Sequence, residues 1–376
     1  MAQSTFGSTP RREIELDFIR GLAILMVVDF HSPSAWLFRP FSLLGFEHFG
    51  WMGVDLFFVL SGFLVGGLLV KELKLRGRVD AYRFLIRRGL KIWPPYYVLL
   101  AIMLLTGHQS LHFLQGNLLN IQNYTGDGVK HTWSLAVEEH TYLILVLLMF
   151  LAARYTVRMR SLFLLLAITS VFTVLLRLTL FELGHPVYFE THTRIEAILY
   201  GVMLAMLYHY VPATFWRLQR QTWLWCTLIV LGLAFFRFHP AYRWTNSVLL
   251  DVANAISIAT IMLLYRSGRE ERSHSFFYRA VAWVGLYSYG IYLWHVSIIS
   301  PVQKLASRLP YGAGVVWLGV APVGAAIVLG VFFTKLIEFP SLKIRDRLFP
   351  RRVDSPVGIP AETEAEQAAS PLALGR

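Results

Sequence analysis

The sequence predicts an all-α membrane protein, a polytopic bundle of about ten transmembrane helices with both termini in the cytoplasm. Three observations lead to this prediction. The 376 residues are 56% hydrophobic and 15% charged, whereas soluble domains are about a quarter charged. Apolar runs of about twenty residues, the length that crosses a bilayer, recur along most of the chain. Basic residues gather in every second connection between those runs.

The apolar runs follow one another through short connections, and polar residues interrupt several of them. An interrupted run still forms a membrane helix when its polar side chains face the protein interior. In chain order, the runs occupy residues 14–35, 50–70, 90–107, 132–153, 161–180, 194–211, 223–238, 247–265, 280–300 and 313–336.

Lysine and arginine set the predicted orientation, because cytoplasmic connections carry an excess of both residues. The basic connections comprise Arg11 and Arg12, then residues 71–91, 154–160, 217–220, 266–272 and 343–352. The alternate connections carry few, namely Arg39, Lys130, Arg243, Lys304 and Arg308. This alternation places both termini in the cytoplasm and agrees with an even number of crossings.

The same distribution excludes nucleic acid as a partner, because the net charge of +12 lies in short connections and not on one binding face. Cys226 is the only cysteine, so an intramolecular disulfide and a cysteine metal cluster are excluded. We expect residues 1–12 to form a cytoplasmic tail and residues 13–345 the transmembrane domain. Residues 346–376, rich in Ala, Glu, Pro and Ser, are expected to form a disordered cytoplasmic tail.

The first run holds an arginine and a histidine at a spacing that puts both on one helix face. Eleven residues separate Arg20 from His31, which is about 16 Å along a helix and nearly whole turns. Such side chains are costly in lipid and usually face the protein interior. Asp17 and Arg20 are i,i+3 neighbours and can neutralise each other; the plainer interpretation is a pair of snorkelling end charges with an interfacial histidine. A neutral histidine suits a general base or nucleophile near pH 7.

The second run and the connection after it hold further charges. Ser61, with the neighbouring glycines, is explained by close helix packing, but an ionised Asp55 inside the membrane needs a partner. Arg87, Arg88 and Lys91 either bind anionic lipid head groups or clamp phosphate oxygens. Sequence physics alone favours neither interpretation.

Two later runs carry polar groups near their ends. Glu138 and Glu139 are about 100° apart on a helix, so at least one points inward and can orient or stabilise an imidazolium. Trp133 and Ser134 precede them, and Trp133 also fits an aromatic anchor at the membrane surface. Tyr292 and His295 lie on an aromatic, polar stripe, where His295 is either a structural histidine or a residue that lines a substrate path.

These stretches together resemble the acyltransferase 3 family of integral membrane acyltransferases, over roughly residues 13–345. The matching motifs are Leu16-Asp17-x-x-Arg20-Gly21 with the Arg-x10-His spacing, Gly53-Val54-Asp55-Leu56-Phe57-Phe58-x-x-Ser61-Gly62, Arg87-Arg88-x-x-Lys91-Ile92-x-Pro94, Trp133-Ser134-Leu135-x-Val137-Glu138-Glu139, Ser288-Tyr289-x-Ile291-Tyr292-Leu293-Trp294-His295 and Glu338-x-Pro340. Three departures are His140 in place of a glutamine, the absence of a later proline in that helix, and Asp29 near His31.

The resemblance implies about ten helices and transfer of an acyl group, commonly acetyl, from cytoplasmic acyl-CoA to a hydroxyl of a sugar or glycan. It implies that His31 is catalytic with Arg20 as its partner, and that Arg87, Arg88 and Lys91 hold the donor. Glu138 or Glu139 is expected to stabilise the imidazolium. We expect the substrate path to be lined by Asp17, Asp55, Ser61, Trp133, Ser134, Tyr292 and His295.

The predicted function is therefore an O-acyltransferase of the bacterial plasma (inner) membrane. Its partners are acyl-CoA (most simply acetyl-CoA), a sugar-containing acceptor and the lipid bilayer, with no tightly bound cofactor and no metal. The alternative from another class is a transporter or flippase, in which the same charges line a path for a lipid-linked or small polar substrate. Consumption of acyl-CoA distinguishes the two.

Overall fold

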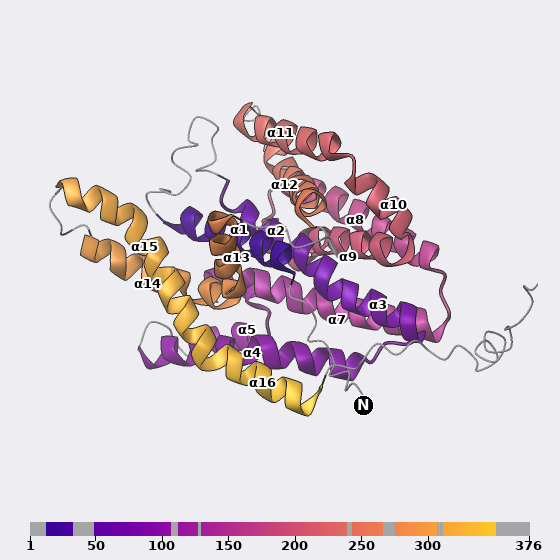
Figure 1. Ribbon diagram of the computed structural model, residues 1–376, viewed down its shortest axis with the longest axis horizontal. Coiled ribbons are helices and arrows are strands. Elements are labelled where there is room, and N and C mark those ends of the chain that lie inside the picture. Colours follow the sequence, from indigo (N-terminus) through magenta and orange to yellow (C-terminus); the bar gives the residue numbers. More distant parts are fainter. Residues whose placement is uncertain are drawn as a thin grey trace, which may run out of the picture.

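The computed structural model confirms the all-α class. It describes residues 13–32, 49–106, 112–126, 129–238, 243–265, 275–306, 308 and 311–350. Within those ranges every regular element is a helix (Figure 1). The predicted tails lie outside the described residues, except for residues 346–350, of which the first three belong to the last helix.

A helix lies at each of the ten apolar runs, and shorter helices fill some connections. The helices are α1 (Ile14–His31), α2 (Met52–Ser61), α3 (Gly67–Arg76), α4 (Ala81–Leu105), α5 (His112–Leu118), α6 (Gln122–Thr125), α7 (Trp133–Arg154), α8 (Met159–Glu182), α9 (Ile195–Tyr210), α10 (Pro212–Gln219), α11 (Thr222–Phe238), α12 (Arg243–Leu264), α13 (Phe276–Leu286), α14 (Ser288–Ala306), α15 (Tyr311–Phe333) and α16 (Phe339–Leu348). Two π-helical turns, η3 (Gly62–Gly66) and η6 (Thr334–Glu338), join α2 to α3 and α15 to α16, and two 3-10 turns, η4 (Lys130–Thr132) and η5 (Thr191–Thr193), precede α7 and α9.

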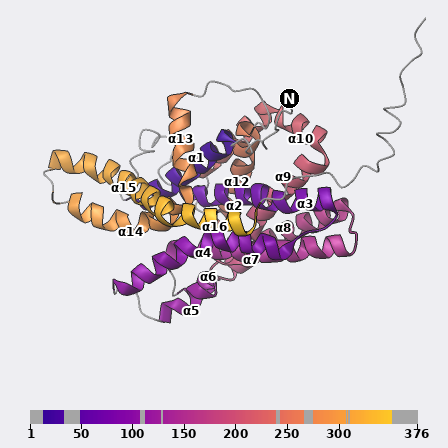
Figure 2. The ribbon, with the colours of Figure 1, turned by 60° about the horizontal axis from the view of Figure 1, so that its bottom comes forward.

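The run at 280–300 is not one helix, and this prediction was wrong. The chain breaks at Tyr287 into α13 and α14, which point in different directions in both ribbon views (Figures 1 and 2). Helix α13 follows α1 so closely that a Cβ on Gly285 would lie 1.8 Å from the carbonyl oxygen of Asp17. Helix α14 instead pairs with α15, and the two project together at one end of the molecule (Figure 2). Apolar periodicity does not reveal such a break, because both parts are apolar.

Four continuous helical segments are long and apolar enough to cross a membrane: Met52–Arg76, Lys130–Arg154, Met159–Glu182 and Val320–Leu348. The bent pair α9 and α10, which turns by 115° at its break, makes a fifth if it counts as one span. Helix α8 shows the outward apolar face expected of a lipid-facing helix, with Leu164, Ile168 and Leu175 all exposed. The count of ten crossings remains a prediction.

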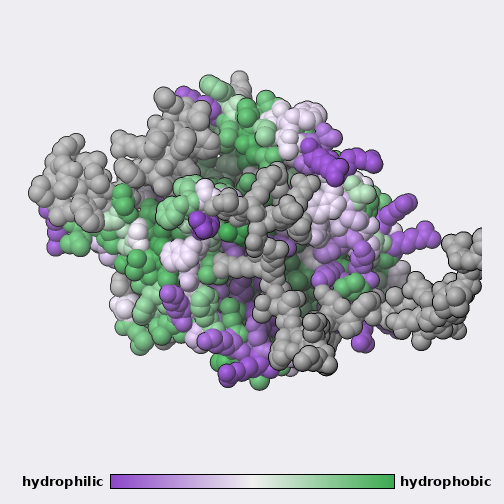
Figure 3. Space-filling view, in the orientation of Figure 1, coloured by the Kyte–Doolittle hydropathy of each residue, from purple (hydrophilic) through white to green (hydrophobic). Residues whose placement is uncertain are grey.

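The surface agrees with a membrane setting. In the space-filling view, hydrophobic residues cover broad areas, while hydrophilic residues gather along the lower edge and at the right-hand end (Figure 3). The basic ends of α3 and α16 lie in those two regions (Figure 1). On this face, the basic residues of α3 and α16 therefore lie at helix ends.

Close helix packing explains the small residues of the second run. A Cβ on Gly62 would lie 1.9 Å from the carbonyl oxygen of Ile198, and a Cβ on Gly201 would lie 2.0 Å from that of Val59. Both distances are far below van der Waals contact, so η3 and α9 approach each other through their backbones. This confirms that Gly62 serves helix packing.

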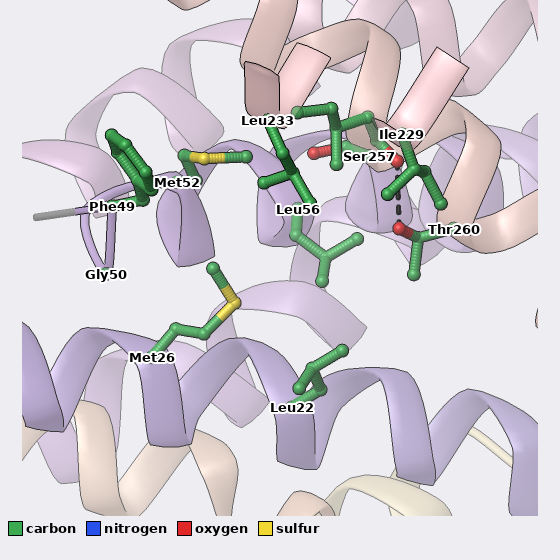
Figure 4. A pocket seen from close by; sticks show the side chains of 11 residues that line it. Leu22, Met26, Phe49, Gly50, Met52, Leu56, Ile229, Leu233, Ser257 and Thr260 are labelled. Carbon is green, nitrogen blue, oxygen red and sulfur yellow. Dashed lines mark hydrogen bonds between the residues drawn. The ribbon is translucent and has the colours of Figure 1, made fainter. Parts of the chain in front are cut away.

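An apolar cavity of about 230 Å³ lies between α1, α2, α11 and α12. Figure 4 shows Leu22 and Met26 of α1 facing Met52 and Leu56 of α2, with Leu233 of α11 above them. The lining includes no charged side chain. The cavity offers van der Waals contact to an alkyl group, and its polar side chains are the hydroxyls of Ser257 and Thr260, which bond to backbone carbonyls of their own helix.

Candidate active site

Helix α1 carries Arg20 and His31 on one continuous helix, as predicted. Arg20 Nη1 lies 3.0 Å from Asp17 Oδ1, which confirms the i,i+3 pair. His31 is the last residue of the helix, and its Nδ1 lies 2.8 Å from the carbonyl oxygen of Val27 one turn earlier. Helix geometry puts Arg20 and His31 about 16 Å apart on one face. One rigid element therefore holds two distinct sites at a set separation.

The site at the far end is a histidine cluster formed by His31, His131 and His295. The ring centres of His31 and His295 are 4.9 Å apart, and those of His295 and His131 are 5.1 Å apart. The three residues come from α1, η4 and α14, which are distant in sequence. The structure thus brings predicted residues His31 and His295 together and adds His131. Its only sequence signal was its place two residues before Trp133.

Backbone hydrogen bonds select one tautomer for each ring. A carbonyl oxygen only accepts, so the ring nitrogen facing it must carry the hydrogen. The donors are His31 Nδ1 to Val27, His131 Nε2 to Leu293 at 3.0 Å, and His295 Nδ1 to Tyr292 at 2.7 Å. In the neutral rings, His31 Nε2, His131 Nδ1 and His295 Nε2 therefore keep a lone pair. His31 is exposed, whereas His295 is fully buried and its Nε2 has no hydrogen-bond partner among the described residues.

Ser134 and Tyr292 support this cluster from below. The Tyr292 hydroxyl donates to the backbone carbonyl of His131, and it lies 2.5 Å from Ser134 Oγ. Because the tyrosine hydrogen is already used, Ser134 donates to the tyrosine oxygen. Both predicted lining residues are buried, and Tyr292 holds the backbone of His131 in place. Their contact with substrate stays a prediction.

A second site, the charged cluster, lies around the other end of this face of α1. It comprises Arg20, Arg88, Lys91, Glu138 and Glu338. Lys91 interacts electrostatically with the other four, and Glu138 with both Arg88 and Lys91. Glu338 belongs to η6, late in the chain. In the sequence it is part of the Glu-x-Pro motif, to which no function was assigned.

Ser61 belongs to the charged cluster's surroundings. Its Oγ lies 2.5 Å from the hydroxyl of Tyr142, which in turn donates to Glu138 Oε2 at 3.3 Å. The guanidinium of Arg88 lies over the Tyr142 ring, 5.3 Å from its centre. Tyr142 therefore links the carboxylate of α7, the cation of α4 and the serine of α2. It was not a predicted site residue.

The two glutamates lie with these cations. Glu138 and Glu139 both interact with Arg88, and in the described part of the chain no hydrogen bond or ion pair joins either of them to His31. The ring that contacts His31 from another helix is His295. The structure thus places the predicted carboxylates beside the Arg20 end of α1.

Asp55 has the buried partner that its burial demands. Its Oδ1 lies 2.7 Å from Arg194 Nη2, and neither side chain is exposed. The guanidinium also lies over the rings of Phe58, Trp133 and Tyr188, at 5.8, 5.5 and 5.1 Å from their centres. Enclosed in this way, Asp55 is a structural ion pair between α2 and the start of α9. Its place on the substrate path stays a prediction, and Trp133 packs on the same arginine.

The ion pair continues into a network that the sequence analysis missed. Arg177 of α8 bonds to Glu196 of α9 and, at 2.6 Å, to Asp251 of α12. Arg177 and Glu196 are fully buried. Their signal was present, since both are charged residues inside predicted membrane runs, which by default mark interior positions.

The basic motif on α4 divides between two environments. Arg87 Nη2 lies 3.0 Å from Asp346 Oδ1 of α16, and Arg87 also donates to the carbonyl of Phe349. Arg88 and Lys91 instead join the charged cluster. Arg87 therefore sits at the rim, where Asp346 is 46% exposed, while the other two cations lie deeper.

We searched the described side chains for a possible metal-binding site. Among the residues that the structure describes, no three His, Cys, Asp or Glu side chains are placed to hold a metal ion.

Comparison with protein families decides the class of the protein. The model of the acyltransferase domain that defines the acyltransferase 3 family matches residues 13–336. The chain belongs to this family. As an acyltransferase of this kind it is an all-α membrane protein, and all three members of the histidine cluster fall within the matched region.

Curated relatives point to O-acetyl transfer. The peptidoglycan O-acetyltransferase OatA of Listeria monocytogenes is 24% identical over 385 residues, which cover 87% of this chain and 55% of the relative. A Bacillus subtilis protein provisionally named a peptidoglycan O-acetyltransferase is 26% identical over 376 residues, covering 90% of this chain and 56% of the relative. The chain thus spans little more than half the length of these relatives. No solved structure matches it.

Proposed function

We propose that the protein is a membrane O-acyltransferase that moves an acetyl group from cytoplasmic acyl-CoA to a hydroxyl of a glycan or other sugar-containing acceptor. One observation carries the proposal: α1 joins a cluster of cations to a cluster of histidines along a single face. Phosphate recognition and acid–base chemistry are thereby held at a separation of about 16 Å. An extended pantetheine arm is of this length scale.

The donor enters from the cytoplasmic end, where α4 carries Arg87 and Arg88. Guanidinium groups bind phosphate oxygens in a bidentate fork. Arg87 is held at rest by the exposed Asp346, and an exposed ion pair is worth about 0–1 kcal/mol. A phosphate can therefore displace that pair at little cost. Arg88 and Lys91 lie deeper, and the arm then passes Arg20.

The reaction takes place at His31. Its Nε2 lone pair removes the proton of the acceptor hydroxyl while the oxygen attacks the thioester carbonyl. The C–S bond then breaks, and the thiolate of CoA takes the proton back from His31. Attack by Nε2 on the thioester, giving an acyl-histidine before transfer, uses the same lone pair. Trapping of an acylated His31 distinguishes the second route from the first.

The acceptor approaches from the opposite end, at the exposed side of His31. Aromatic side chains gather near this end: the ring centres of Trp133 and Phe189 are 5.3 Å apart, and Phe189 is 45% exposed. Aromatic faces with polar neighbours suit the mixed apolar and polar surface of a sugar. The names of the relatives support a glycan acceptor. Ten crossings, cytoplasmic termini and residence in the bacterial inner membrane belong to the same proposal.

The test is acetyl transfer by purified protein in nanodiscs, supplied with acetyl-CoA and fragments of de-O-acetylated cell-wall glycan. His31→Ala is expected to abolish thiol release and O-acetylation together, whereas His185→Asn, at an exposed position, is the matched control. Transfer at the wild-type rate by His31→Ala would defeat the proposal. Movement of a lipid-linked sugar without consumption of acetyl-CoA would favour a flippase.

A further inference from the structure

The histidine cluster contains one group that the proposed reaction does not use. His295 is fully buried, and its Nε2 has no hydrogen-bond partner among the described residues. A buried acceptor without a donor costs about 1–3 kcal/mol and calls for an explanation. Of the rings from other elements that contact His295, that of His31 is the nearer, with ring centres 4.9 Å apart.

We propose that His295 is the partner of the catalytic base, a positioning residue that shares the proton of His31. This inference rests on the proposed role of His31. When His31 Nε2 takes the proton from the acceptor hydroxyl, His31 becomes an imidazolium. It passes that proton to Nε2 of His295, whose Nδ1 already carries a hydrogen. The proton returns by the same path to the CoA thiolate as the C–S bond breaks, so no proton is gained or lost.

The two rings lie within reach of this transfer, and in the resting structure no hydrogen bond joins them. Hydrogen-bonded nitrogens are about 2.7–3.2 Å apart, and two imidazoles joined edge to edge at that distance have ring centres about 5 Å apart. The tautomers also agree: the Tyr292 carbonyl holds the hydrogen on Nδ1 of His295, so its Nε2 is the nitrogen available to accept. The exposed ring of His31 can meet substrate, while the enclosed ring of His295 cannot.

In the part of the chain that the structure describes, the ring that contacts His31 from another helix is the imidazole of His295, and not the carboxylate that usually partners a catalytic histidine. The rings that contact His295 from other elements are those of His131 and His31. Asp29 of α1 is two residues from His31, about 200° around the helix. Tyr292 lies on α14 itself, and the charged side chains of α4 and η6 belong to the charged cluster. Helix α15, which packs along α14, has no charged residue. A second neutral imidazole is therefore the group that can spread the charge.

His131 has a different part, as a strut behind His295. Its Nε2 donates to the carbonyl of Leu293, and its own carbonyl accepts from the Tyr292 hydroxyl. These two bonds tie η4 to the turn of α14 that carries His295. This role requires a hydrogen-bond donor at the position of Nε2, but it does not require the ring to take up or release a proton. The amide of a glutamine can therefore replace the imidazole of His131.

Substitutions separate the two roles. His295→Asn keeps an amide nitrogen near the position of Nδ1 and so keeps the bond to Tyr292, but it has no base at Nε2. His131→Gln keeps a donor near the position of Nε2. The assay is thiol release from acetyl-CoA with de-O-acetylated glycan fragments, in wild type, His31→Ala, His295→Asn, His295→Gln and His131→Gln, with His185→Asn as control. Size-exclusion chromatography and thermal unfolding report folding.

We expect His295→Asn to lower kcat by about 100-fold, the lower range for acid–base assistance, with an unchanged KM for acetyl-CoA. The solvent isotope effect is the decisive readout: wild type should show a curved dependence on deuterium fraction, from two protons in motion, and His295→Asn a linear one. His131→Gln should keep the curved dependence, and its fall in kcat should be smaller than that of His295→Asn.

The outcomes are distinct. A linear dependence in the wild-type enzyme overturns the relay without any variant, even if both His295 variants misfold. Wild-type kcat in a folded His295→Asn does the same. Activity of His31→Ala at the wild-type rate instead defeats the proposed function. If a folded His131→Gln lost as much activity as His295→Asn, the relay would not be specific to His295, and the proposal would be overturned.

Discussion

The imidazole of His31 lies edge-on to the imidazole of His295, with ring centres 4.9 Å apart and ring planes at 71°. One residue ends the first helix and the other lies in α14, late in the chain. The contact shows that His31 faces α14. It also gives the last residue of α1 a neutral, basic neighbour.

Removal of Arg88 should weaken donor binding more than turnover. A charge-assisted hydrogen bond is worth about 1.5–3 kcal/mol, so Arg88→Ala should raise the KM for acetyl-CoA by about 10- to 100-fold. The measurement is steady-state kinetics with acetyl-CoA and with its 3′-dephospho form. If Arg88 binds the 3′-phosphate, Arg88→Ala should raise the KM less for the 3′-dephospho donor than for acetyl-CoA. Arg78→Ala, exposed in the same connection, is the control, and an equal rise in its KM would contradict a specific clamp.

Asp55→Asn should destabilise the fold without a specific effect on catalysis. It leaves the guanidinium of Arg194 buried without its carboxylate, and breaking a buried ion pair costs about 3–5 kcal/mol. Thermal and chemical unfolding in detergent measure the loss. The double variant Asp55→Leu with Arg194→Met should recover much of it, because a matched apolar pair carries no stranded charge.

For that pair, activity is the second readout. If the double variant folds with full stability but loses acetyl transfer, Asp55 acts on substrate, and its assignment as a structural residue is wrong.

Gly62→Ala should destabilise the contact between η3 and α9. The new Cβ would lie 1.9 Å from the carbonyl oxygen of Ile198, and forcing such helices apart costs about 1–3 kcal/mol or more. Gly324→Ala on α15 is the matched control, since a Cβ there meets nothing within 4 Å. A lowered midpoint of thermal unfolding for the first and an unchanged one for the second is expected. Equal midpoints would mean that the helices are not in backbone contact.

Tyr292→Phe should loosen the histidine cluster. It removes the hydroxyl that donates to the carbonyl of His131 and accepts from Ser134, and each buried group left unpaired costs about 1–3 kcal/mol. We expect a lower unfolding midpoint and a fall in kcat with the donor KM unchanged. A double-mutant cycle with Ser134→Ala measures the coupling of the two hydroxyls. Fully additive effects would show that the short contact between them contributes nothing.

The sequence predicted most strongly where the interactions are local. Ion pairing of Asp17 with Arg20 follows from helix periodicity alone, and the structure confirms it. The need of Asp55 for a partner was also readable, since a lone carboxylate is too costly in the membrane. Which residue supplies that partner was not readable, because Arg194 is far along the chain and reaches Asp55 only through packing of α9 on α2.

The break at Tyr287 shows what local sequence patterns do not predict. Both α13 and α14 are apolar, so their composition predicts one span, and the split arises because α13 packs on α1 while α14 pairs with α15. The missed network of Arg177 and Glu196 has the same origin. In the sequence, each of these charges appears as an unpaired charge inside its own membrane helix. The opposite charge that neutralises it lies on a neighbouring helix.

The sequence by itself determined the all-helical membrane class, the family, and the placement of Arg20 and His31 on one helix, because apolar length and helical periodicity act within a segment. Only the tertiary structure decided that His31 meets His295 and His131, that Glu138 lies with Arg88 and Lys91, and that Asp55 is enclosed. Those relationships depend on how closely helices approach, and the approach is set by backbone contacts at Gly62, Gly201 and Gly285, not by the spacing of residues along the chain.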